Sequence, residues 1–333
     1  MKTIVLLDTT GNERVDHLLR EIIIGYEIAF PERMRGYYIE GSYADHSNVT
    51  TSDVDLIALF NGDFVSDEEC EKAEEMARRF VDESEIELDI EVMKEQGLGD
   101  GLWPTFKMGS LLLYGEDIRD RYPLLPLDVW TRDRMHSSLW RTVNLCNRPA
   151  VLSYPLDYPD PVGEFYGYDR RKVRLADGDE VNCTRDLIRL TGWSATAILA
   201  FKAGKYVARK SDCHKIYQAC FDDEWGQLLE NIYVLCRGKW NYLIPSEQGE
   251  QSKLREICQR TLGFENHFLQ IYKEFVLSDL RNSYSQSVLQ TLNVMKCFVY
   301  RDKEIEAAVR ALAEDEDDEV RSVARAMLGK FAG

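Results

Sequence analysis

The chain has 333 residues, of which 44% are hydrophobic and 11% aromatic, so it is long enough for two domains with hydrophobic cores. Its 58 acidic and 41 basic residues leave a formal net charge of −17. That balance argues against a general nucleic-acid-binding protein, because such proteins carry a basic face. No stretch approaches the roughly 18 consecutive apolar residues of a membrane-spanning helix, so no membrane segment is expected.

The eight cysteines include no Cys-x-x-Cys pair, which argues against a structural zinc site or a redox motif. Several lie inside apolar helical patterns, as Cys236 does in the run IYVLC. We therefore expect reduced thiols in a cytoplasmic protein. The N-terminal apolar run is short and soon followed by charged residues, so it does not predict a signal peptide.

The first part of the chain alternates between helical and extended patterns. Asn12 is expected to cap a helix that Pro31 ends. A strand over residues 37–40 follows, then a Gly-Ser turn. A second strand reaches residue 60, and Ser66 is expected to cap a helix that runs to residue 80. Further predicted elements are a strand over residues 85–93, a glycine-rich loop over 94–105 that contains Trp103, and a helix over 106–113.

The most informative stretch joins Gly41-Ser42 to Asp53-x-Asp55 across ten residues. Carboxylates at positions i and i+2 of a strand point to the same face, where they repel each other unless a cation lies between them. Mg²⁺ commonly binds to one or two carboxylates together with substrate phosphates. A glycine tolerates positive φ and lets backbone N–H groups and the Ser42 hydroxyl approach phosphate oxygens. The pattern predicts metal-assisted handling of a nucleoside triphosphate.

Gly41-Ser42 followed by Ser52-Asp53-Val54-Asp55-Leu56 resembles the signature of the DNA polymerase β-like nucleotidyltransferase superfamily. Within it, the order and spacing of elements to about residue 245 most resemble the aminoglycoside adenylyltransferases of the streptomycin/spectinomycin type, which are antibiotic-modifying enzymes. The resemblance implies Asp53 and Asp55 as Mg²⁺ ligands, Gly41 and Ser42 as phosphate-binding groups, and ATP as the nucleotide.

The same resemblance implies a third carboxylate on a neighbouring strand, as a catalytic base or a metal ligand. The segment over residues 85–93 places three acids on one face of a strand. We choose Asp89 because its distance to the later Leu113–Asp117 segment best matches the family, and Glu87 and Glu91 remain alternatives. The family has a glutamate here, so an aspartate leaves the role of Asp89, base or ligand, open.

The resemblance also implies a lysine that contacts the nucleotide phosphates, just before a helix of the C-terminal domain. Lys210, which follows Gly204 at the expected spacing, is the matching residue. As a point cation it would offset triphosphate charge. The family's arginine on the preceding helix has no counterpart here, and Arg185 and Arg189 are the nearest substitutes.

The C-terminal two thirds of the chain predict mainly helices. Expected helices cover residues 131–145, 185–203 with Gly204 as C-cap, a segment that contains Trp225, and most of 250–298. Residues 148–182 hold most of the prolines and predict a long irregular excursion. The tail over 303–331 resembles one HEAT-like repeat, whose apolar faces must stack on the preceding helices or on a protein partner.

These observations predict an α/β fold in which a small mixed sheet (1–120) precedes a helical domain (121–298) and a helical tail (299–333), with the active site in a cleft between the first two. The predicted activity is Mg²⁺-dependent transfer of AMP, or another nucleotide monophosphate, to a hydroxyl of a small molecule, and the resemblance suggests an aminoglycoside as that molecule. An acidic cleft would attract a polycationic acceptor. Alternatives are a protein or tRNA acceptor, or a non-catalytic nucleotide-binding scaffold.

Overall fold

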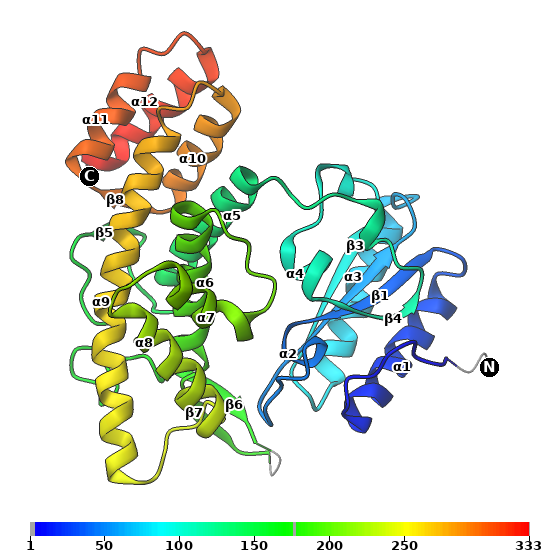
Figure 1. Cartoon of the computed structure of the whole chain (residues 1–333). Helices are drawn as coiled ribbons and strands as arrows, with labels where there is room; N and C mark the ends of the chain where they lie inside the picture. Colours follow the sequence, from blue (N-terminus) through cyan, green and yellow to red (C-terminus); the bar gives the residue numbers. More distant parts are fainter. Residues whose placement is uncertain (1–3, 176–177, 333) are drawn as a thin grey trace. The chain divides into compact units, whose positions relative to one another are not determined.

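The computed structural model describes residues 4–175 and 178–332 (Figure 1). The chain forms two compact units. The first comprises Met1–Leu127 and Tyr206–Cys213, and the second comprises Asp128–Lys205 and His214–Gly333. The predicted class, a small mixed sheet followed by a helical region, is confirmed. Residues 206–213 return to the first unit, a feature that the predicted boundaries do not contain.

The first unit is built on one four-stranded sheet in the order β3-β2-β1-β4. Strands β2 and β3 are parallel and are joined through a helix, whereas β1 is antiparallel to both β2 and β4. Its elements are α1 (Glu13–Ala29), β1 (Met34–Glu40), α2 (Gly41–Ala44), β2 (Val54–Phe60), α3 (Asp67–Glu83), β3 (Leu88–Lys94), η1 (Leu98–Asp100), α4 (Pro104–Gly109), β4 (Leu111–Gly115) and η2 (Arg119–Arg121).

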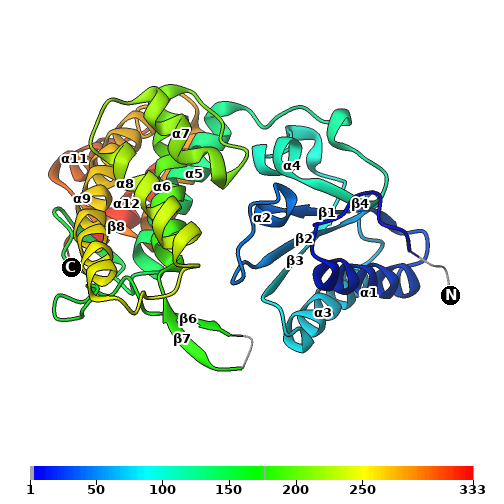
Figure 2. The ribbon, with the colours of Figure 1, turned by 60° about the horizontal axis from the view of Figure 1, so that its bottom comes forward.

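The two faces of this sheet carry different side chains because residues alternate along each strand. One face packs against α1 and α3, which lie side by side in Figure 2. Val54, Leu56 and Ile90 belong to that core. The opposite face has a smaller core, in which Tyr38 and Ile57 pack against α4 and the loop before it. The sheet is therefore fully covered on one side and partly covered on the other.

The predicted N-terminal caps of the first two long helices are confirmed, and α3 runs three residues beyond its predicted end at residue 80. The side chain of Asn12 accepts hydrogen bonds from the backbone N–H groups of Arg14 and Val15, at 3.1 and 3.2 Å. The Ser66 hydroxyl accepts one from the N–H of Glu69 at 3.3 Å. These caps satisfy N–H groups that have no partner within the helix.

The helix predicted over residues 106–113 is wrong in its second half. Helix α4 ends at Gly109, and Leu111–Gly115 is the edge strand β4, paired with β1. The run of leucines is short and apolar on both sides, so its periodicity does not separate a helix from a strand. The segment is a strand because it pairs with β1, which places Leu112 and Leu113 in the cores on the two opposite faces of the sheet.

The second unit is mainly helical, as predicted. Its longest helix, α9, runs from Gln248 to Asp279 and packs against α6, which ends at Gly204 in the left-handed conformation with φ 62°. The elements are α5 (Leu127–Asn144), β5 (Val151–Ser153), β6 (Arg171–Arg174), β7 (Glu180–Cys183), α6 (Arg185–Ala203), α7 (Lys210–Cys220), α8 (Trp225–Asn231), the π-helix η3 (Ile232–Lys239), α9, α10 (Ser285–Cys297), β8 (Val299–Arg301), α11 (Lys303–Leu312) and α12 (Asp318–Ala332).

A buried polar network ties α5, α9 and α10 together. Arg132 donates to Asp279 through two nitrogens, at 3.1 and 3.0 Å. Asp279 also accepts from the Thr291 hydroxyl at 2.6 Å. His136 lies between the Tyr272 and Thr291 hydroxyls, at 2.9 and 3.1 Å. Such a network is costly to break, since removal of one member leaves a buried polar group without a partner.

The first part of the stretch predicted to be irregular, residues 148–168, packs onto α9. Arg148 pairs with the buried Glu265 at 2.8 Å, and the Tyr168 hydroxyl donates to the same carboxylate. The N–H of Leu156 donates to the Asn266 side chain at 2.7 Å. Strand β5 within this stretch pairs in parallel with β8.

The tail forms two helices, α11 and α12, as predicted. Ile305 and Val309 of α11 and Val320, Ala324 and Met327 of α12 are buried. They pack against each other and against α9 and α10 of the same unit. The tail therefore buries its apolar faces within this chain, and the predicted protein partner at the tail stays a prediction.

All eight cysteines are free thiols, and five of them are buried. Within residues 4–175 and 178–332, no helix has the length and apolar character needed to cross a membrane.

We predict that His136 makes the helical unit sensitive to acid. Burial lowers the pKa of His136 from 6.5 to about 4. Between pH 6.5 and pH 4, His136 binds a proton in the unfolded chain but not in the folded chain. The free energy of unfolding therefore falls by up to about 3 kcal/mol as the pH drops. Urea unfolding at several pH values measures this loss.

The His136→Gln variant should be less stable than wild type at pH 7. Between pH 6.5 and pH 4 it should lose less free energy of unfolding than wild type, because it has no imidazole to protonate at this position. His17→Gln removes an exposed histidine of the first unit and is the control. Equal acid losses in wild type and His136→Gln would contradict the prediction.

Candidate functional site

A row of carboxylates crosses three neighbouring strands on the partly covered face of the sheet. Asp55 of β2 is the register partner of Glu40 on β1 and of Asp89 on β3. Register partners in a sheet carry their side chains on the same face, close enough to interact. Asp53 lies two residues before Asp55 and directly precedes the first residue of β2. The structure thus brings Asp55 and Asp89 side by side at one end of their strands, and the place of Asp53 in the site stays a prediction.

The register distinguishes the three acids considered for the third carboxylate. Asp89 is opposite Asp55, whereas Glu91 is opposite Ile57, further along the strand. Glu87 precedes β3, and its carbonyl accepts the N–H of Val54 at 2.9 Å. Loss of hydration and the neighbouring Asp89 carboxylate raise the pKa of Glu91. Asp89 is therefore the acid best placed beside Asp55, and its role as the third site residue stays a prediction.

Gly41 begins the short helix α2 directly after β1, with a backbone φ of +70°. A β-carbon at this position would lie 2.5 Å from Oδ2 of Asp55. Both the backbone conformation and the close approach to Asp55 thus require glycine. The first N–H groups of a helix have no partner within it, so the start of α2 offers donors next to the carboxylate row. The Ser42 hydroxyl makes no hydrogen bond to another described residue.

Lys210 lies in the segment that returns to the first unit. Its neighbour Ser211 donates a hydrogen bond to Asp45, at 2.7 Å, just after α2. The Tyr206 hydroxyl donates to the carbonyl of Leu125 at 2.7 Å, which fixes the other end of the segment. Lys210 is exposed and has no ion pair with a described residue. The structure therefore anchors Lys210 to the part of the first unit that carries Gly41 and Ser42.

Glu40 belongs to the carboxylate row, and the sequence analysis missed it. The indole N–H of Trp103 donates to its carboxylate at 3.0 Å. Burial, together with the charges of Glu91 and Asp55, raises the pKa of Glu40 to about 7, although hydrogen bonds from Trp103 and Thr105 oppose the shift. An acid that ends an otherwise apolar strand just before Gly41 is the signal that could have identified it.

The same contact assigns a position to Trp103. Its ring packs against Phe106 at 5.4 Å between centroids, and its N–H holds Glu40. Arg185 and Arg189, the substitutes considered for the family's arginine, belong to α6 of the second unit.

The donors at this edge suit Mg²⁺ but do not form a closed metal cage. In the described part of the chain, no three His, Cys, Asp or Glu side chains are grouped so that they could hold a metal ion. Mg²⁺ usually keeps several waters and binds through one or two carboxylates plus substrate phosphates. Asp53 and Asp55, with a glycine in place of any side chain beside Asp55, fit that partial coordination.

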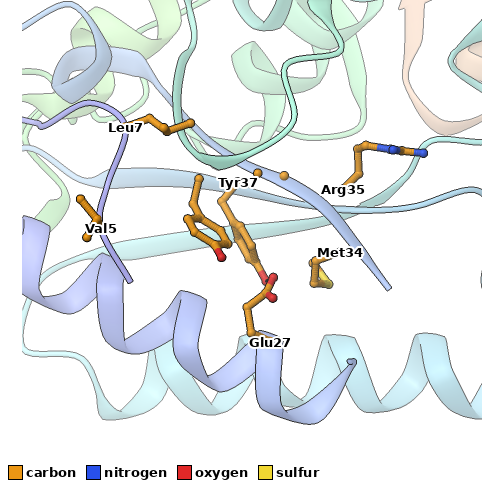
Figure 3. A pocket seen from close by; sticks show the side chains of 9 residues that line it. Val5, Leu7, Glu27, Met34, Arg35 and Tyr37 are labelled. Atoms are coloured by element: carbon orange, nitrogen blue, oxygen red, sulfur yellow. The ribbon is translucent and has the colours of Figure 1, made fainter. Parts of the chain in front are cut away.

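A separate pocket of about 390 Å³ lies on the α1 face of the sheet (Figure 3). Val5, Leu7 and Met34 line it, and the Tyr37 hydroxyl donates to Glu27 at 3.2 Å. None of the predicted site residues borders this pocket, and the carboxylate row lies on the opposite face of the sheet.

Two solved structures resemble parts of this chain. A candidate nucleotidyltransferase from Sulfolobus solfataricus is 24% identical, with coverage of 34% of this chain and 89% of that one and a TM-score of 0.24. Spectinomycin adenyltransferase AAD(9) from Enterococcus faecialis, solved with ATP and spectinomycin, is 13% identical, with coverage of 76% and 99% and a TM-score of 0.44. No family model and no curated protein matches the chain.

We predict that Glu40 destabilises the first unit at neutral and basic pH. Its pKa is raised from 4.5 to about 7, so the folded state holds a proton that the unfolded state releases. Stability is therefore lost as the pH rises from 4.5 to 7, by up to about 3 kcal/mol. With a metal chelator present, Glu40→Gln should have a higher free energy of unfolding than wild type at pH 8. At pH 4.5 the two proteins should have similar free energies of unfolding.

Urea unfolding at the two pH values tests this expectation. Glu71→Gln, which removes an exposed acid of α3, is the control and should show no such gain. If Glu40→Gln were no more stable than wild type at pH 8, ionisation of Glu40 would not destabilise the folded state, and the prediction would be wrong.

Gly41→Ala and Gly62→Ala separate backbone strain from the close approach to Asp55. Both glycines have positive φ, +70° and +73°, but nothing lies within 4 Å of a β-carbon at Gly62. Each substitution should cost about 1–2 kcal/mol for a left-handed alanine. Gly41→Ala should cost more, because the Asp55 carboxylate must also move, and equal losses in urea unfolding would contradict the close contact.

Proposed function

We propose that this protein is a metal-dependent nucleotidyltransferase that moves a nucleotide monophosphate, AMP in the first instance, from a nucleoside triphosphate to a hydroxyl group. The observation that carries the proposal is the row of Asp55 and Asp89 on adjacent strands beside Gly41. Acids held on one face without a cation among them repel each other, so their grouping supports a site that receives positive charge.

In this proposal Asp53 and Asp55 hold one or two Mg²⁺ ions, with Asp89 as the third carboxylate. When bound, Mg²⁺ would supply charge that neutralises phosphate oxygens and polarises the attacking and leaving oxygens. The N–H groups at Gly41 and the Ser42 hydroxyl bind phosphate oxygens, and Lys210 adds a cation. Most of the catalysis then comes from positioning and from neutralising charge.

The proposed reaction forms one bond and breaks another at the same phosphorus. The acceptor hydroxyl oxygen attacks the α-phosphorus of the triphosphate, and the bond from that phosphorus to the oxygen that bridges it to the β-phosphate breaks. Pyrophosphate leaves, and the hydroxyl proton passes to a carboxylate. Asp89 is one candidate acceptor. Glu40 is the other, because it is the register partner of Asp55 on the neighbouring strand β1.

We propose a small, positively charged molecule with hydroxyl groups as the acceptor, and an aminoglycoside as the first class to test. The net charge of −17 would draw a polycation toward the protein, and the resemblance of the motif to aminoglycoside adenylyltransferases agrees with this choice. The cytosol is the proposed compartment, since eight thiols without a disulfide suit a reducing environment.

Transfer of label from [α-³²P]ATP tests the proposal. Wild type with Mg²⁺ should label one member of a panel of aminoglycosides, tRNA and cell extract. Asp55→Asn should lose about 10²–10³-fold in rate, comparable to the removal of one preorganised electrostatic group. Asp63→Asn, which changes an acid of the same unit that pairs with Lys94 outside the row, should keep wild-type activity.

Two outcomes would count against these assignments. Absence of transfer to every acceptor, with ATP and with the other triphosphates, would overturn the enzymatic proposal. If Asp55→Asn and Asp63→Asn were equally active, the protein would still be an enzyme, but its active site would not be at the carboxylate row. Single replacements of Asp89, Glu87 and Glu91 then identify the third carboxylate by the largest loss.

A further inference from the structure

The pocket on the α1 face of the sheet contains a partly buried carboxylate. Glu27, in the last turn of α1, lines this pocket. Its carboxylate accepts a hydrogen bond from the hydroxyl of the buried Tyr37 at 3.2 Å, and the two groups meet in Figure 3. Among residues 4–175 and 178–332, no basic side chain forms an ion pair with Glu27. The pocket therefore holds a fixed negative charge without a counter-charge from the described chain.

The other walls of the pocket are mainly apolar. Val5 and Leu7 of the N-terminal segment are 72% and 65% exposed, and Met34 of β1 and Tyr114 of β4 line the pocket with them. The N–H of Leu7 donates to the carbonyl of Leu113 at 2.8 Å, which holds the N-terminal segment beside the sheet. The pocket thus has a fixed apolar wall that is open to solvent.

The basic groups nearest to this pocket are bonded elsewhere. Arg35 also lines it, but its guanidinium pairs with two other carboxylates, at 2.8 and 2.6 Å, and Figure 3 shows it directed away from Glu27. Lys72 of α3 donates to the carbonyl of Ala29 at 3.1 Å. The C-terminal end of a helix also carries partial negative charge, which adds to that of Glu27.

We infer that this pocket binds a small organic cation, with a protonated amine beside Glu27 and an apolar body against Val5, Leu7 and Met34. Ligand sites commonly combine apolar walls with a few polar groups that fix the orientation of the ligand. An ammonium group donates charge-assisted hydrogen bonds to a carboxylate, whereas an anion would be repelled by it. The volume of about 390 Å³ is sufficient for a small molecule.

The inference does not depend on nucleotidyl transfer. None of the predicted site residues lines this pocket, and the carboxylate row lies on the opposite face of the sheet.

Ligand-observed NMR titration of the full-length protein with 2-phenylethylamine tests the inference. An alkyl amine of this kind is protonated at neutral pH, as a lysine side chain is. Wild type should bind it saturably at concentrations up to about 10 mM. 2-Phenylethanol has the same body without the charge and should bind about tenfold more weakly, because its hydrogen bond to the carboxylate is not charge-assisted.

Two variants test the two parts of the pocket separately. Glu27→Gln keeps the shape of the side chain and should remove the preference for the amine over the alcohol. Leu7→Ser should weaken binding of both compounds, because it removes apolar contact. Leu7 is exposed, so this change leaves no cavity in the core.

Matched controls exist for each variant in the same unit. Glu13→Gln changes an exposed acid at the other end of α1, and Val65→Ser changes a valine that is 73% exposed. Neither residue lines the pocket. Both controls, and Asp55→Asn in the carboxylate row, should bind the amine as wild type does. Circular dichroism checks that each variant is folded.

Absence of saturable amine binding in wild type would overturn the inference. Equal affinity for the amine and the alcohol, or an unchanged preference in Glu27→Gln, would overturn the assignment of a cation to this pocket. Equal binding by wild type and both pocket variants would place the amine elsewhere and would contradict the inference as well. Loss of the preference in Glu27→Gln, with weaker binding in Leu7→Ser and unchanged controls, would support it.

Discussion

The alternation of side chains along β1, β2 and β3 is the constraint on which the first unit depends. One set of residues forms the core with α1 and α3, so the other set must face the opposite side. At the end of β1 and the beginnings of β2 and β3, that other set is acidic. A slip of one residue in the register would bury the acids and expose the core. The same strand register thus both buries the core of the sheet and places the carboxylates on the opposite face.

That arrangement has an electrostatic cost, which the structure only partly offsets. Hydrogen bonds from Trp103 and Thr105 favour the ionised form of Glu40, yet its pKa stays raised because burial and neighbouring acids dominate. Proteins keep unfavourable charges of this kind mainly where a ligand or cation uses them.

Local patterns in the sequence predicted most of the first unit, because capping residues, alternation and the Gly-Ser and Asp-x-Asp spacing are local signals. Asn12, Ser66 and Gly204 end or begin helices as their residue types predict. What depends on contacts between distant segments was not predictable. Strand β4 owes its conformation to pairing with β1, and Glu40 owes its environment to Trp103, 63 residues away. Only the register of β2 with β3 separates Asp89 from Glu87 and Glu91 by position.

The return of residues 206–213 to the first unit has a consequence for how the protein is made. Ser211 and Asp45, which hydrogen-bond, are 166 residues apart in sequence. On a ribosome the sheet and its helices can form early, but this unit stays incomplete until the chain beyond α6 has emerged. A fragment that stops at Leu127 would carry the acids and lack Lys210. Dissection of the two units therefore calls for a rearranged or linked chain rather than a simple truncation.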